Sequence, residues 1–210
     1  MKNADDLPLR VVDAIRRAEG SDWCLPDSVT SIKSFTGHKV QHFLDALCSH
    51  PDTVYLEIGT WNGGTMAAAA WGNLGSFTGI DRFSDFGGSP DGTREKFREV
   101  GVNARLIEAD CWTVPMAELP QGVNVFFYDG PHDFESHRRA LPHFAEIMAP
   151  QFIFVVDDWE DDKVREATAL GILDANLKTL AYHRLGQGEH ESQAGWWNAL
   201  GVFALAKDSP

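Results

Sequence analysis

The stretch VYLEIGTWNGGTMAAAA, residues 54–70, decides the fold expected for this chain. A short apolar run is followed by three glycines within six positions, Gly59, Gly63 and Gly64, and then by a run of alanines. This order predicts a buried strand that turns sharply into a helix. In open parallel sheets, ligands bind beyond the carboxyl ends of the strands, where glycine lets the backbone come close. The stretch therefore predicts a ligand site at this turn.

The rest of the chain continues the alternation of strands and helices. Strands are expected at residues 53–58, 77–81, 104–109, 123–129 and 152–158, and helices at 64–72, 92–100, 113–119, 135–148 and 162–176, with Pro150 separating the fourth helix from the fifth strand. A polar loop without a helix joins two further strands, 177–185 and 197–207, which are expected to be antiparallel neighbours. The pattern predicts an α/β fold whose seven-stranded, mostly parallel sheet ends in an antiparallel hairpin, with helices on both faces.

The first 50 residues differ from the rest, because they contain two amphipathic helical patterns, at 9–20 and 37–50. We expect residues 1–50 to form a helical cover over the carboxyl edge of the sheet and residues 51–210 to form the ligand-binding domain, in one domain overall. Packing on a flank of the sheet, without contact to ligand, is the alternative. The exposed helix pair also offers a surface for a homodimer.

Composition favours small-molecule partners. The 31 acidic and 18 basic residues give a formal net charge of -13, which would repel a nucleic acid. No apolar run is long enough to span a bilayer, and MKNADDLPLR lacks the apolar centre of a signal peptide, so a cytoplasmic protein without membrane contact is expected. Three scattered cysteines, Cys24, Cys48 and Cys111, are expected to be reduced packing residues.

The spacing of the glycine turn, E-x-G-x-x-x-G-G-T, differs from the G-x-G-x-x-G of pyrophosphate-binding turns. It resembles motif I of class I S-adenosylmethionine-dependent methyltransferases, in the version found in catechol and caffeoyl-CoA O-methyltransferases, with Thr65 in the place of a serine. The segments GHKVQHFLDALC, DRFSDFGG, YDGPHDFESH and VVDDW look like those of macrocin O-methyltransferase-like proteins. The resemblance implies a Rossmann-like methyltransferase fold of the metal-dependent branch and S-adenosylmethionine as cofactor.

The resemblance also implies which residues bind this cofactor. Its methionine part would lie on the glycine turn, its ribose on Asp81 and its adenine on Asp110. A carboxylate accepts two hydroxyl protons well, although Asp81 and Asp110 also suit ordinary turns at strand ends. The full set of expected cofactor-binding residues is Glu57, Gly59, Thr60, Gly63, Thr65, Asp81, Asp110 and Asp129.

Carboxylates also end the fourth and fifth predicted strands, at Asp129 and at Asp157 and Asp158. Neighbouring parallel strands would gather them over one crevice, where either one carboxyl group holds a proton or a cation sits among them. Hard cations such as Mg²⁺ prefer oxygen ligands. In the resembling enzymes this arrangement binds a divalent metal, which implies Asp129, Asp157 and Asp158 as metal ligands. Capping of the following turn and simple solvation are the alternatives.

His132 lies three residues after Asp129 and is a candidate general base at neutral pH, whereas His137 is a weaker one. The chain is thus expected to be a methyltransferase that O-methylates a small hydroxylated molecule, with a divalent metal gripping the acceptor and His132 or Asp129 as catalytic residue. Methyl transfer without metal, with His132 alone as base, stays open. An NAD-dependent reductase and a non-catalytic nucleotide-binding module are the alternatives from other classes.

Overall fold

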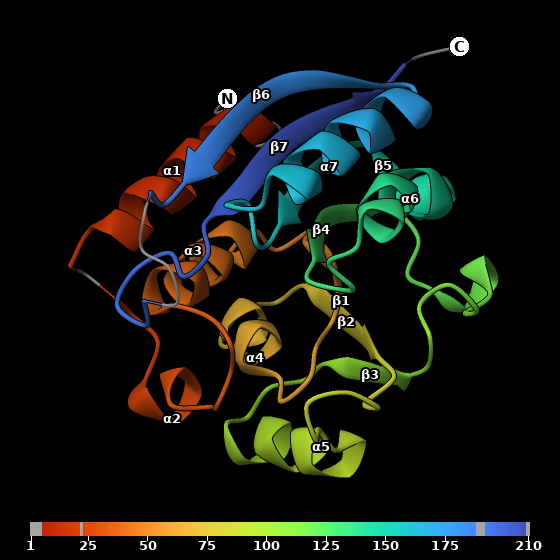
Figure 1. Cartoon of the computed structure of the whole chain (residues 1–210). Helices are drawn as coiled ribbons and strands as arrows, with labels where there is room; N and C mark the ends of the chain where they lie inside the picture. The colour runs from red at the N-terminus through yellow and green to blue at the C-terminus, as the bar shows by residue number, and fades with distance from the viewer. Residues whose placement is uncertain (1–5, 22, 188–191, 209–210) are drawn as a thin grey trace.

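The computed structural model describes residues 6–21, 23–187 and 192–208. It contains one seven-stranded sheet with the order β3-β2-β1-β4-β5-β7-β6 (Figure 1). The strands are β1 (Val54–Ile58), β2 (Ser76–Asp81), β3 (Arg105–Glu108), β4 (Val123–Tyr128), β5 (Met148–Val156), β6 (Leu177–Leu185) and β7 (Leu200–Lys207). The first five are parallel, whereas β7 is antiparallel to both β5 and β6. The predicted fold is confirmed.

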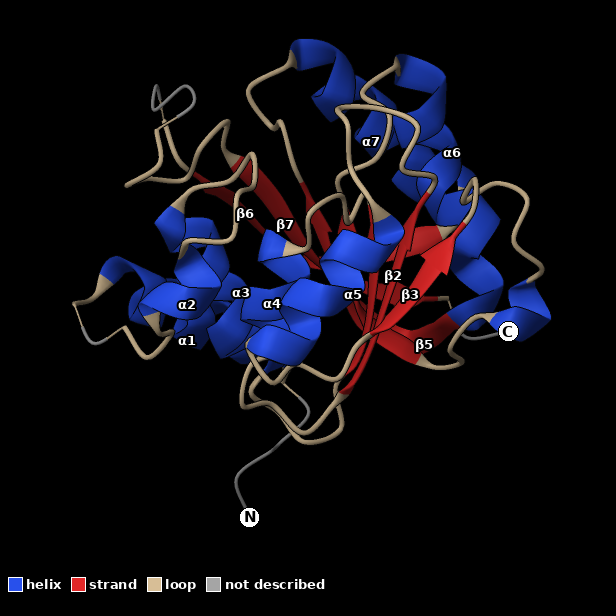
Figure 2. Ribbon diagram, turned by 90° about the horizontal axis from the view of Figure 1, so that it is seen from below, coloured by secondary structure: helices blue, strands red, loops and turns tan. Residues whose placement is uncertain are grey.

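Helices cover both faces of this sheet (Figure 2). Because a parallel strand is buried on both sides, successive side chains enter two different cores. Tyr55 and Phe127 pack in the core under α1 (Leu7–Glu19), α3 (His38–Cys48), α4 (Gly64–Ala70) and α5 (Pro90–Glu99). Leu56 and Phe126 pack in the other core, under α6 (Phe134–Phe144) and α7 (Asp162–Asp174). Cys48 and Cys111 are buried in these two cores, and Cys24 is exposed.

The N-terminal helices α1 and α3 pack on a flank of the sheet. Val11 of α1 and Phe43 of α3 belong to the same core as Val155 of β5, because the apolar stripes of both helices face the sheet. The connection between them contains the short helix α2 (Asp27–Thr30) and returns past the glycine turn. A Cβ added at Gly64 would lie 2.5 Å from Oγ of Ser34 in this connection. The division into a cover and a domain stays a prediction.

Two helix boundaries differ from the prediction. In place of a helix over 113–119, the chain forms only the 3-10 turn Met116–Glu118. The helix expected over 135–148 is α6 up to Phe144 and then a 3-10 turn over Ala145–Ile147, and β5 begins at Met148 and includes Pro150. The strand tolerates this proline because the register between β4 and β5 shifts here, so that no regular ladder bond is lost. Within the described ranges, no helix combines the length and apolarity that crossing a bilayer requires.

Candidate functional site

The glycine turn connects β1 to α4 and packs against Asp129 at the end of β4. Gly59 has φ +92 and its N–H donates to the carbonyl of Ile80 at 2.9 Å. A Cβ at this position would overlap the carbonyl oxygen of Asp129. Gly63, with φ +83, is the N-cap of α4 and faces the ring of Phe97. These two glycines thus let backbone and neighbouring side chains pack closely, which brings the turn against Asp129.

Replacing Gly59 by alanine is therefore expected to destabilise the protein strongly. The left-handed backbone alone costs about 1–2 kcal/mol for a residue with a Cβ, and the overlap with Asp129 adds to it. Gly72 is the matched control, because it has φ +69 but nothing within 4 Å of an added Cβ. Thermal unfolding should show a loss of about 2–4 °C per kcal/mol for a chain of this size. Equal melting temperatures of the Gly59→Ala and Gly72→Ala variants would contradict this reason for Gly59.

Glu57 lies beneath the turn with no exposed surface. Burial raises the pKa of its carboxyl group to about 8, against the opposing effect of a 2.6 Å hydrogen bond from the hydroxyl of Tyr55. Oε1 of Glu57 and Oγ1 of Thr60 are buried and make no hydrogen bond of ordinary geometry in the described part of the chain, while the neighbouring hydroxyl groups of Thr65 and Thr60 act to lower the pKa of Glu57. Thr65 is also buried, at 5% exposure. The turn thus gathers polar side-chain atoms whose hydrogen bonding is incomplete, which is compatible with a polar ligand group nearby.

Asp81 ends β2 and is tied directly to the glycine turn. One carboxylate oxygen accepts the backbone N–H of Trp61 at 2.7 Å, and the other accepts that of Phe83 at 2.6 Å. Because a carboxylate offers about four acceptor positions, room for two hydroxyl donors remains. Asp81 therefore fits the ribose role expected from the sequence. Asp110 accepts the N–H of Trp112 at 3.0 Å, as a turn residue does, and its adenine role stays a prediction.

Aromatic side chains gather beside this turn, and Trp61, which the sequence analysis did not single out, is one of them. Trp61, Phe83 and Phe86 all have left-handed backbones, with φ values of 41, 55 and 55. The ring of Trp61 stacks on Phe35 at 4.5 Å, and Phe35 contacts Phe86 edge-on at 5.8 Å. Strained aromatic residues are uncommon and cluster at functional sites. Trp61 lies in a turn, where neither hydrophobic periodicity nor residue preference gives a signal, so sequence analysis did not identify it.

The aspartates that end β4 and β5 come together around His132. Nδ1 of His132 lies 2.6 Å from Oδ2 of Asp158, and its Nε2 lies 3.7 Å from Oδ1 of Asp129. The imidazole thus stands between two carboxylates. Asp157 is 6% exposed and continues the ladder, with its N–H bonded to the carbonyl of Tyr128. The left-handed backbone of Asp158, with φ 51, turns that residue and not Asp157 toward His132.

The sequence analysis left two ways to relieve repulsion among these carboxylates, a bound proton or a cation. Ion pairs with Asp129 and Asp158 raise the pKa of His132 to about 10, so the imidazole is protonated at neutral pH. Burial raises the pKa of Asp129 to about 6 and that of Asp157 well above its usual range. Burial acts on Asp158 in the same direction, but hydrogen bonds with His132 and Asn198 lower its pKa overall. In this charge state His132 can donate a proton, and its role as a general base stays a prediction.

The predicted metal ligands do not form a metal site in the part of the chain that the structure describes. No group of three or more His, Cys, Asp or Glu side chains is arranged there to hold an ion. The reason is geometric, because His132 stands between Asp129 and Asp158 while Asp157 is buried. A protonated imidazole and a protonated carboxyl group relieve the repulsion that otherwise requires a cation.

His137, the weaker candidate base, is 2% exposed, and burial lowers its pKa to about 4.

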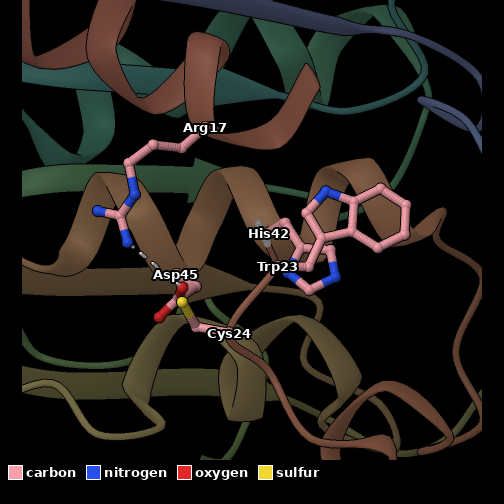
Figure 3. Close-up of a pocket in the computed structure, with 5 residues that line it drawn as sticks. All are labelled: Arg17, Trp23, Cys24, His42 and Asp45. Carbon is pink, nitrogen blue, oxygen red and sulfur yellow. Dashed lines mark ion pairs between the residues drawn. The ribbon is translucent and has the colours of Figure 1, made fainter. Parts of the chain in front are cut away.

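A separate small pocket lies among the N-terminal helices and contains none of the predicted site residues (Figure 3). Trp23 stacks on His42 at 4.5 Å, and Arg17 reaches toward Asp45 at 4.0 Å. Cys24 completes the lining. The candidate site is therefore the carboxyl edge of the sheet, where the turn, Asp81 and the His132 cluster lie.

This fold and edge define a class I methyltransferase architecture, and comparisons with known proteins agree. Residues 56–159 match the model of a family described as a methyltransferase domain. None of the curated proteins matches the chain in sequence. The fold and this match together support a methyltransferase.

Solved structures share the fold at low identity. TrmN from Thermus thermophilus is 15% identical with a TM-score of 0.60, and the match covers 86% of this chain and 52% of TrmN. A Corynebacterium glutamicum protein is 15% identical with a TM-score of 0.61, covering 93% and 91%. An O-methyltransferase from Bacillus cereus in complex with SAH is 14% identical with a TM-score of 0.57, covering 96% and 90%. The chain therefore spans about half the length of TrmN but most of the other two.

Proposed function

We propose that this protein transfers the methyl group of S-adenosylmethionine to an oxygen of a small hydroxylated molecule. The observation that carries the proposal is the placement of the His132 cluster beside the turn that holds Asp81, at one edge of the sheet. When bound, the cofactor supplies an electrophilic methyl group. Asp81 would bind its ribose hydroxyls, and the turn from Gly59 to Thr65 would hold its amino-acid part.

Within the cluster, Asp129 is the best placed proton acceptor. Its side chain is 24% exposed, whereas Asp157 is buried and both oxygens of Asp158 already accept hydrogen bonds. A carboxylate with a pKa of about 6 is ionised at neutral pH and can take the hydroxyl proton of the acceptor. The protonated His132 beside it would stabilise the oxygen as negative charge develops. Alignment of that oxygen with the methyl group supplies the rest of the catalysis.

The carboxylates at this edge favour a neutral or cationic acceptor over an anionic one. The expectation that nucleic acids are not substrates stays a prediction. The homodimer through the N-terminal helices likewise stays a prediction. A divalent cation is the alternative means of activating the acceptor oxygen.

Exhaustive chelation tests the choice between these two mechanisms. We expect methyl transfer from radiolabelled S-adenosylmethionine to survive dialysis against EDTA, because His132 provides the positive charge among the carboxylates. The acceptor panel should contain catechols, sugars and hydroxy acids, with an RNA pool as the contrasting substrate. Activity that disappears with chelation and returns with Mg²⁺ would show that the metal-assisted mechanism is the correct one. Tight binding of NADH but not of S-adenosylhomocysteine would favour the reductase, and cofactor binding without transfer to any acceptor would favour a non-catalytic module.

A further inference from the structure

The segment 192–199, between β6 and β7, reaches the His132 cluster from a distant part of the chain. Backbone N–H groups of Trp159 and Glu160 donate to the carbonyls of Ala199 and Asn198, each at 3.1 Å. These bonds extend the pairing of β5 with β7 past the ends of both strands. They place the side chain of Asn198 beside Asp158, where its Nδ2 donates to Oδ1 at 2.7 Å.

The backbone at this contact is strained on both sides. Trp197 and Ala199 have φ values of 54 and 66, and Asp158 has φ 51. Residues with a Cβ enter this region only at a cost in free energy, so the surrounding contacts must hold them there. The consequence is geometric: Oδ1 of Asp158 faces Asn198, while Oδ2 faces Nδ1 of His132.

The N-terminal helices anchor the segment. Trp196 is 2% exposed, packs edge-on against Phe43 of α3 at 5.9 Å, and donates from Nε1 to Glu19 of α1 at 2.7 Å. The carbonyl of Gln193 accepts the N–H of His38 at 2.7 Å. The segment is thus held by the flank helices at its start and by β7 at its end, with Asn198 close to the β7 end.

We infer that Asn198 is a positioning residue, which holds the carboxylate of Asp158 so that Asp158 fixes the ring of His132 against Asp129. Without the amide, Asp158 is free to rotate about its side-chain bonds, and the imidazole loses its short hydrogen bond. The inference rests on the proposed function for its catalytic consequence, but the hydrogen-bonded chain itself does not depend on it. Through the same segment, α1 and α3 contribute to the site without touching it.

The Asn198→Ala variant tests this inference with two independent measurements. We expect kcat to fall about 10- to 100-fold, since a small displacement of a catalytic group costs this much, while KM for S-adenosylmethionine changes less than twofold. By proton NMR, the downfield resonance of the His132 Nδ1 proton should move or disappear. Asn124→Ala is the matched control, because Asn124 bonds Val54 and Asp52 at 2.9 and 2.8 Å at the opposite edge of the sheet.

The control should lower the melting temperature but leave both kcat and the His132 resonance unchanged. An Asn198→Ala protein that keeps kcat within twofold and the same resonance overturns the inference. The NMR measurement separates this from failure of the proposed function, because it needs no activity: an enzyme without methyl transfer that still loses the resonance in Asn198→Ala retains the positioning chain. Asn198→Asp, which places a second carboxylate beside Asp158, should move the resonance at least as far as alanine does.

Discussion

Replacing Asp81 by alanine is expected to weaken the binding of S-adenosylhomocysteine by about 10²- to 10⁴-fold. A hydrogen bond to a charged group contributes about 1.5–3 kcal/mol, and the ribose would donate two of them to this carboxylate. The substitution also removes the acceptor of the Trp61 and Phe83 N–H groups, which joins the glycine turn to the end of β2. Calorimetric titration of the purified variant measures the effect.

The control for this prediction is Asp85→Ala. Asp85 lies four residues further along the same loop and pairs with Arg82 at 2.9 Å, with more than half of its side chain exposed. Its removal should leave affinity within twofold and the melting temperature nearly unchanged. Should Asp81→Ala bind S-adenosylhomocysteine within threefold of the unmodified protein while remaining folded, the cofactor does not lie where we propose.

The second large effect is expected at His132. In the His132→Ala variant kcat should fall about 10²- to 10³-fold, as expected when one donor that stabilises a developing negative charge is removed. The loss has two physical causes. The acceptor oxygen loses the positive charge that stabilises it, and Asp129 and Asp158 lose the cation between them. Affinity for S-adenosylhomocysteine should change less than threefold, because Asp81 and the turn remain.

His50→Ala is the matched control, since His50 also lies beside a carboxylate, that of Asp52 at 4.0 Å, but directly before β1 at the opposite edge of the sheet. It should retain full activity. The neutral variant His132→Gln separates charge from shape: we expect it to be nearly as inactive as His132→Ala. Full activity of His132→Gln would mean that the imidazolium charge has no part in the reaction, and activity of His132→Ala above one tenth would remove His132 from the mechanism.

Much of the fold was accessible from local pattern. The apolar run, the glycines and the alanines of residues 54–70 encode strand, turn and helix, and the polar sequence between the last two apolar runs, without a helical pattern, predicts the terminal hairpin. The strand-end aspartates could be predicted as one cluster because parallel strands share an edge. Helix ends were less accessible: Pro150 looked like a boundary, yet it lies in β5 at an irregularity in pairing with β4. Such an irregularity depends on the register between two strands, so the sequence of one strand alone does not reveal it.

What the sequence determined by itself is therefore the order of elements and the kinds of side chain at the carboxyl edge. The tertiary structure alone decided that α1 and α3 pack on a flank, that Asp158 instead of Asp157 meets His132, and that Asn198 holds Asp158 from 40 residues away. The physical reason is range. Periodicity and turn chemistry act over a few residues, whereas a side chain's direction and the pKa of a buried group depend on neighbours that only the packed sheet brings together.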